Sequence, residues 1–167
     1  MNKNIFIKVI FIALVLMLAW NLRAHAVETL NIDFDEDDYM RAGQEYTHLI
    51  RTSNWSGFLD TNYRPEHPPL AKIVIGLSLL SAPERDLIPD APTTAQPNRN
   101  IPSDLIQPAR TTNAIIGVLT VLVLTIINPV AGLALATHSL TIKYVSQVML
   151  EALPALTSFL TVLAYLQ

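Results

Sequence analysis

The chain has 167 residues, of which 51% are hydrophobic and 15% charged, and its mean hydropathy is +0.36. This composition is too apolar for an ordinary soluble domain and predicts a membrane protein. The absence of cysteine excludes a disulfide scaffold and a thiolate metal site. The net charge of −3 excludes little by itself, but the sequence has no basic patch of the kind that binds nucleic acid. Thirteen of the fourteen acidic residues lie between Glu28 and Asp104, so an acidic region precedes the most apolar part.

The first apolar segment, residues 5–22, has two interpretations. As a membrane span it needs about 20 apolar residues, and it reaches that length only if Lys8 extends toward the inner interface. As a cleavable signal peptide it would end at Ala24-His25-Ala26, which fits a small-x-small cleavage site. In both cases Lys3 and Lys8 predict a cytoplasmic N-terminus and an extracytoplasmic location for the residues after Ala26.

Residues 27–110 are predicted to form an acidic extracytoplasmic loop with short surface helices. Apolar or small residues at 39, 43, 46 and 50 have helical spacing and follow a cluster of acids, which favours a helix start. The run from Leu70 to Leu80 is too short to span and predicts an interfacial or re-entrant helix. Six of the eleven prolines fall between Pro83 and Pro108, so we expect no regular structure there.

The last third predicts further spans, at about 112–127, 130–141 and 151–167, the middle one shortened. Asn128-Pro129 marks a turn between the first two. If residues 114–136 were instead one span, Glu151 would lie on the opposite side of the membrane from the acidic loop. Because the sequence stops within its last apolar run, we expect an incomplete, all-α, polytopic multi-pass protein.

Two neighbouring motifs carry residues suited to catalysis. Asp35-Glu36-Asp37-Asp38-Tyr39 follows the first apolar segment, and Glu66-His67-Pro68-Pro69-Leu70-Ala71-Lys72 begins the next apolar run. A carboxylate in partly apolar surroundings has a raised pKa and can act as a general base. A lysine nearby can stabilise the negative charge of a phosphate. Together they predict a site at the membrane surface for a hydroxyl nucleophile and a lipid phosphate.

These motifs, with Arg110 and the run from Ser146 to Glu151, resemble the protein O-mannosyltransferase and aminoarabinose transferase group of GT-C glycosyltransferases. The resemblance implies the N-terminal part of a GT-C fold. It also implies transfer of a sugar from a polyprenyl-phosphate donor to a hydroxyl acceptor on protein, lipid or glycan. Asp35 would then be the catalytic base and Glu36 its support. The residues implied to line the donor site are Tyr39, Glu66, His67, Lys72, Arg110 and Glu151.

Some related folds require a divalent cation, for which Asp35 and Glu151 are the candidate ligands. Members of the family are far longer, so we expect this chain to be inactive alone. The alternative is a non-catalytic membrane accessory or scaffold subunit. Residue by residue, the acidic run can be a solvated helix cap, Lys72 an interfacial anchor, and Glu151 the end of a helix at the interface.

Overall fold

The computed structural model describes residues 3–60, 65–88 and 101–165, and all regular structure within these ranges is helical. The predicted all-α class is therefore confirmed for these residues. The elements are α1 (Lys3–Thr29), α2 (Glu36–Arg51), α3 (Gly57–Asp60), α4 (Pro69–Ser78), the 3₁₀ turn η1 (Leu79–Ser81), α5 (Ser103–Ile127), α6 (Pro129–Thr137), α7 (Ser139–Val145) and α8 (Ala152–Tyr165).

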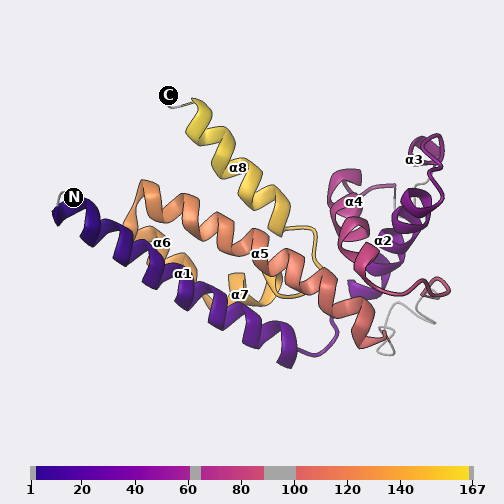
Figure 1. Cartoon of the computed structure of the whole chain (residues 1–167), viewed down its shortest axis with the longest axis horizontal. Helices are drawn as coiled ribbons and strands as arrows, with labels where there is room; N and C mark the ends of the chain where they lie inside the picture. Colours follow the sequence, from indigo (N-terminus) through magenta and orange to yellow (C-terminus); the bar gives the residue numbers. More distant parts are fainter. Residues whose placement is uncertain (1–2, 61–64, 89–100, 166–167) are drawn as a thin grey trace.

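Two helices among the described residues, α1 and α5, are long and apolar enough to cross a membrane. They have 27 and 25 residues, and at about 1.5 Å per residue each exceeds the roughly 30 Å of a hydrocarbon core. The two helices pack side by side in opposite directions (Figure 1). Large apolar side chains on α1, including Leu14 and Met17, are exposed. A bilayer accommodates such a surface, which water does not.

Helix α1 continues past the predicted end of the first span at residue 22. It runs through the small-x-small site to Thr29, and Arg23, Ala26 and Val27 on its last turns are buried. Cleavage after Ala26 would therefore remove a helix that packs against α5, α6 and α7. The retained span stays a prediction, because a signal sequence near the N-terminus has the same length and hydropathy.

The helices α5 and α6 form a tight antiparallel hairpin, so residues 114–136 are not one continuous helix. The side chain of Asn128 accepts hydrogen bonds from the N–H groups of Val130 and Ala131, which caps α6. Pro129 occupies the first turn of α6, where its missing N–H costs nothing. A Cβ at Gly132 would lie 2.5 Å from Thr125 Cα, so the two backbones touch. Instead of one helix at 130–141, the structure has two helices, α6 and α7, and the polar last turn of α7 continues beyond 141 to Val145.

The prediction of an irregular stretch up to Pro108 is wrong from residue 103 onward. Helix α5 begins at Ser103 and includes Pro108, although proline removes one helical hydrogen bond. The reason is tertiary: Leu105, Ile106 and Ala109 are buried in the main apolar core with residues of α2 and α4. Burial of large apolar side chains stabilises by about 1.5–3 kcal/mol each, which outweighs one lost bond. Residues 89–100, with three of the prolines, lie outside the described residues.

Helices α2 and α4 pack against each other at the end of the α1–α5 pair that is far from the N-terminus (Figure 1). Both were predicted, and Tyr39, Ala42 and Tyr46 of α2 are buried as their spacing indicates. The helices approach closely at two glycines, since a Cβ at Gly76 would lie 2.9 Å from the carbonyl oxygen of Gly43. This α2–α4 unit carries most of the residues singled out by the sequence.

Candidate functional site

Glu36 is fully buried, and its carboxylate is hydrogen-bonded on all sides. It accepts from Arg110 Nε at 2.9 Å and Nη2 at 2.6 Å. The backbone N–H groups of Asp33 and Val148 also donate to it, at 2.8 and 2.7 Å. A two-point arginine–carboxylate pair of this kind is among the strongest hydrogen-bonded contacts in proteins. We call this Glu36–Arg110 pair, with its backbone partners, the clasp.

Arg110 uses its remaining N–H groups to cap the end of α1. The guanidinium, on a side chain that is 3% exposed, donates to the carbonyl oxygens of Val27, Leu30 and Asn31 at 2.8–3.1 Å. A cation is favourable at the negative end of a helix dipole. The clasp therefore joins the ends of α1, α2 and α5 to the segment before α8. This engagement gives Glu36 a structural role, and the supporting role in catalysis implied by the resemblance stays a prediction.

The non-helical segment 146–150 between α7 and α8 is buried against the clasp. Asn113 donates to the carbonyl oxygens of Gln147 and Met149, at 2.9 and 2.8 Å. Gln147 in turn donates to the carbonyl oxygen of Asn31 at 3.0 Å. These bonds fix where the segment ends, and Glu151 comes next as an exposed residue. The structure thereby places Glu151 at the same end of the long helices as α2 and α4.

A second ion pair ties α7 to the loop before α2. Lys143 Nζ lies 2.8 Å from Asp33 Oδ2, and both side chains are partly exposed. The hydrogen bond from Lys143 is the main reason why the pKa of Asp33 lies below its usual value, and the same bond raises the pKa of Lys143. Lys143 lies beyond the predicted third span at 130–141, so both groups are outside the apolar segments.

This pair predicts a pH dependence confined to the extremes. The contribution of Asp33 is present above its unfolded pKa of 3.8 and is lost as pH falls through its lower folded pKa. The contribution of Lys143 is present below 10.5 and is lost as pH rises through its higher folded pKa. We expect Asp33→Asn to lower the free energy of unfolding by at most about 1 kcal/mol. In chemical denaturation this difference should be constant from about pH 5 to 9 and should shrink in stronger acid. A difference that changed between those limits would contradict the assignment.

The acidic run at the start of α2 is not simply a solvated cluster. Glu36 and Asp37 are 0% and 2% exposed. Asp35 is the N-cap residue and is partly buried, but its side chain makes no capping hydrogen bond. Of the two acids predicted as catalytic, Asp35 is therefore the one whose carboxylate is not held in the clasp.

Tyr39, Glu66, His67 and Lys72 form a second group, between α2 and the start of α4. The rings of Tyr39 and His67 are in edge-to-face contact with centroids 5.3 Å apart, and His67 Nε2 lies 3.7 Å from Glu66 Oε1. Lys72 is fully buried, which does not fit an interfacial anchor. Burial lowers the pKa of Lys72, while the charges of Glu66 and Glu45 act in the opposite direction.

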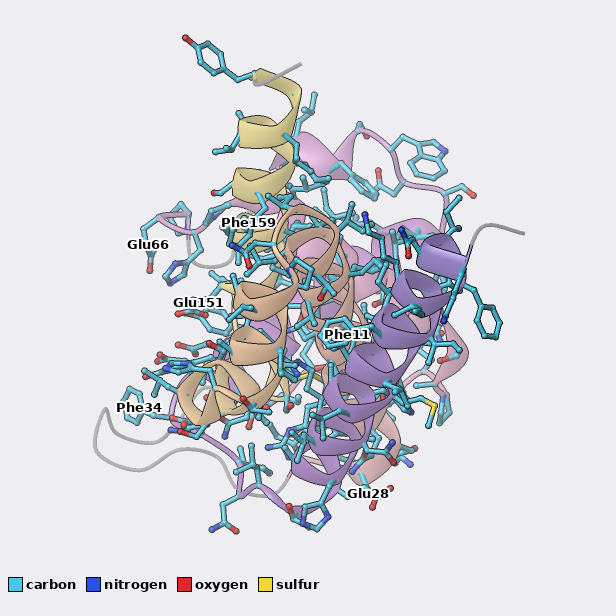
Figure 2. The ribbon with its side chains drawn as sticks, turned by 90° about the vertical axis from the view of Figure 1, so that its left-hand side faces the viewer. Phe11, Glu28, Phe34, Glu66, Glu151 and Phe159 are labelled. Atoms are coloured by element: carbon cyan, nitrogen blue, oxygen red, sulfur yellow. The ribbon has the colours of Figure 1, made fainter. Side chains whose placement is uncertain are left out.

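Glu66 and Glu151 lie on the same side of the molecule (Figure 2). Both are exposed. Within the described residues no group of three or more histidines and carboxylates is placed to hold a metal ion, so Asp35 and Glu151 belong to no such group. The divalent cation that the resemblance allows stays a prediction.

A cavity of about 600 Å³ opens beside the predicted site, between one face of α2 and residues 83–87. None of the predicted site residues lines it. The polar side chains that line the cavity hydrogen-bond to the backbone. Gln44 accepts from the N–H of Ile88 and donates to the carbonyl oxygen of Asp86. Arg51 donates to the carbonyl oxygen of Leu79. The sequence analysis missed Gln44 and Arg51, and their position on a helix whose other face is apolar was the available signal.

Over the residues that the structure describes, the fold is all-helical with two potential membrane spans, and the residues singled out above gather at one end of those spans. No protein-family model, curated protein or solved structure matches the chain.

Proposed function

We propose that the chain is the N-terminal membrane part of a GT-C-like glycosyltransferase that uses a polyprenyl-phosphate-linked sugar and a hydroxyl acceptor on protein, lipid or glycan. One observation carries this proposal. Residues of the two predicted motifs, Asp35-to-Tyr39 and Glu66-to-Lys72, lie on neighbouring helices at one end of α1 and α5. The clasp locks that end in place.

In the proposed topology the chain is multi-pass, with a cytoplasmic N-terminus. Helix α1 crosses outward, α5 crosses back, α6 and α7 return together, and α8 turns inward again. The α2–α4 unit and Glu151 are then extracytoplasmic. This arrangement is supported by the antiparallel α1–α5 pair and the hairpin at Asn128. The head group of a carrier lipid reaches the membrane surface at that level.

Each proposed role derives from the chemistry of the side chain. Asp35 is the base that takes the proton of the acceptor hydroxyl, because its partial burial suits a general base. Lys72 is a desolvated ammonium, which gains free energy from a nearby anion. The negative charges of Glu66 and Glu45 act on the Lys72 ammonium. A bound phosphate would take over this compensation of the positive charge of Lys72. Glu66, whose charge acts on Lys72, lies beside His67, and His67 contacts the ring of Tyr39.

This proposal predicts binding of polyprenyl phosphate, without sugar, to the full chain in lipid nanodiscs. Charge-assisted hydrogen bonds contribute about 1.5–3 kcal/mol, so Lys72→Met should weaken binding by roughly ten- to a hundredfold. Titration of a fluorescent short-chain polyprenyl phosphate measures this affinity. Lys8→Met is the matched control. It is also a lysine-to-methionine change, but Lys8 lies near the start of α1, at the end of that helix far from the α2–α4 unit. Equal affinity of the Lys72 and Lys8 variants would contradict the assigned phosphate contact.

The second candidate, a non-catalytic accessory subunit, is favoured by a different observation. Glu36 and Arg110 are saturated by contacts within the chain. Such a subunit would show no affinity for polyprenyl phosphate beyond that of empty nanodiscs. Under the first proposal we expect binding without transfer by this chain alone. Sugar transfer by the parent chain would contradict that expectation of inactivity. If this transfer were lost in Asp35→Asn, the result would support the role of Asp35 as the base.

A further inference from the structure

Arg23 is the largest fully buried side chain of α1, and it lies among apolar helices. Its guanidinium donates to the carbonyl oxygen of Ala19 on its own helix, at 3.1 Å. It also donates to the last turn of α6, to Ala136 at 3.2 Å and Leu135 at 3.3 Å. None of these partners is an acid, so the contact differs from the clasp, where a carboxylate compensates Arg110.

The two carbonyl groups of α6 that Arg23 contacts lie where the helix breaks, and that of Leu135 also accepts from the N–H of His138 at 3.4 Å. His138 has φ −70° and ψ 111°, which is extended backbone, so α6 ends at Thr137 and α7 starts afresh at Ser139. The last carbonyl groups of a helix have no partner within it. In water they are solvated, but in hydrocarbon each unpaired group costs several kcal/mol. A positive charge is also favoured at this end of the α6 dipole.

The neighbouring helix leaves room for this contact. Gly117 of α5 faces both Arg23 and α7, since a Cβ there would lie 3.2 Å from Arg23 Nε and 2.6 Å from Val145 Cγ2. Ala19 and Ala136 are 0% exposed and small. Three small residues from α1, α5 and α6 thus surround one arginine, which is the composition expected for a built contact between closely packed membrane helices.

We propose that Arg23 is a positioning residue: it replaces the donors that α6 loses at His138 and so holds the third apolar segment as two helices that deliver Glu151 to the α2–α4 end. The proposal rests on the membrane topology given under the proposed function. Without the guanidinium, the carbonyl group of Ala136 loses its donor and that of Leu135 keeps only the 3.4 Å bond from His138, which favours one continuous helix from 129 to 145. That helix would point the 146–150 segment away from its place on the clasp.

Labelling of single cysteines tests this proposal, because the chain has no cysteine of its own. Glu151→Cys reports the position of the segment, and Ser56→Cys, on the exposed turn after α2, reports insertion of the α2–α4 unit. The probe is a membrane-impermeant maleimide added from the extracytoplasmic side. We expect Arg23→Met to slow labelling at position 151 by about tenfold, which corresponds to about 1.4 kcal/mol, and to leave position 56 unchanged. Arg23→Lys should restore part of the rate, because an ammonium still donates to carbonyl groups.

Asn21→Leu is the control, since Asn21 is exposed on the same helix and bonds only within it, to Met17. An unchanged rate at position 151 in Arg23→Met would overturn the proposal. So would an equal loss at position 56, because Arg23 would then support the whole fold and not the break. If the parent chain is labelled at 56 but not at 151, the topology fails, and the proposed function fails with it.

Discussion

Replacing Arg110 with methionine should destabilise the chain by about 3–5 kcal/mol, the largest loss expected from any single substitution. The variant keeps the volume of the side chain but leaves Glu36 as a buried carboxylate without a cation. It also removes one donor from each of three carbonyl groups at the end of α1, of which only that of Asn31 keeps another, from Gln147. Unfolding in a mixed-micelle denaturant titration measures the change in free energy.

Arg85→Met is the matched control for this experiment. Arg85 pairs with Asp104 at 2.7 Å, but their side chains are 47% and 38% exposed, and exposed pairs contribute about 0–1 kcal/mol. The double variant Arg110→Met, Glu36→Leu should recover part of the loss, since it removes the uncompensated charge. A loss in Arg110→Met no greater than in Arg85→Met would show that the clasp is not buried in the membrane-inserted protein.

Local sequence patterns were sufficient for α2, α4 and the α5–α6 turn. The spacing of Tyr39, Gly43 and Tyr46 identifies the buried face of α2, and Asn128-Pro129 identifies the turn because both residues have local backbone effects. The start of α5 could not be predicted in this way. Proline content is a local signal, whereas the burial of Leu105 and Ile106 depends on α2 and α4.

The clasp could not be predicted from spacing, because Glu36, Arg110 and Val148 are far apart in the sequence. The motifs indicated that Glu36 and Arg110 matter but not that they bind each other, so Glu36 was expected to assist catalysis. The sequence motifs assigned no role to Arg23. A signal for its burial was present, because Val15, Ala19 and Arg23 occur at intervals of four and all lie on the buried side of α1.

Replacing Gly132 with valine should open the α5–α6 hairpin. A Cβ at this position would overlap Thr125 Oγ1 and would lie 2.5 Å from Thr125 Cα. The hydroxyl can rotate away, but the Cα belongs to the backbone of α5 and cannot. Overpacking usually costs about 1–3 kcal/mol, and contact with a fixed backbone atom lies at the upper end of that range or beyond it. Separation of the two helices relieves the clash.

We expect Gly132→Val to change the side of the membrane on which Glu151 lies. Once α6 cannot fold back on α5, an alternative that keeps apolar residues in the bilayer is one span from 114 to 136. In the proposed topology, that arrangement moves Glu151 to the cytoplasmic side. A cysteine at 151 should then lose its reaction with an extracytoplasmic maleimide and gain reaction with one supplied from the cytoplasmic side, while a cysteine at 56 keeps its orientation.

Ala134→Val separates this steric effect from the lower helix propensity of valine, because Ala134 is exposed on the same helix. We expect it to leave the side of residue 151 unchanged. If Gly132→Val also leaves it unchanged, the cap at Asn128 rather than the close crossing determines the hairpin. Asn128→Leu would then be the substitution that moves Glu151 across the membrane, because it removes the acceptor for two N–H groups at the start of α6.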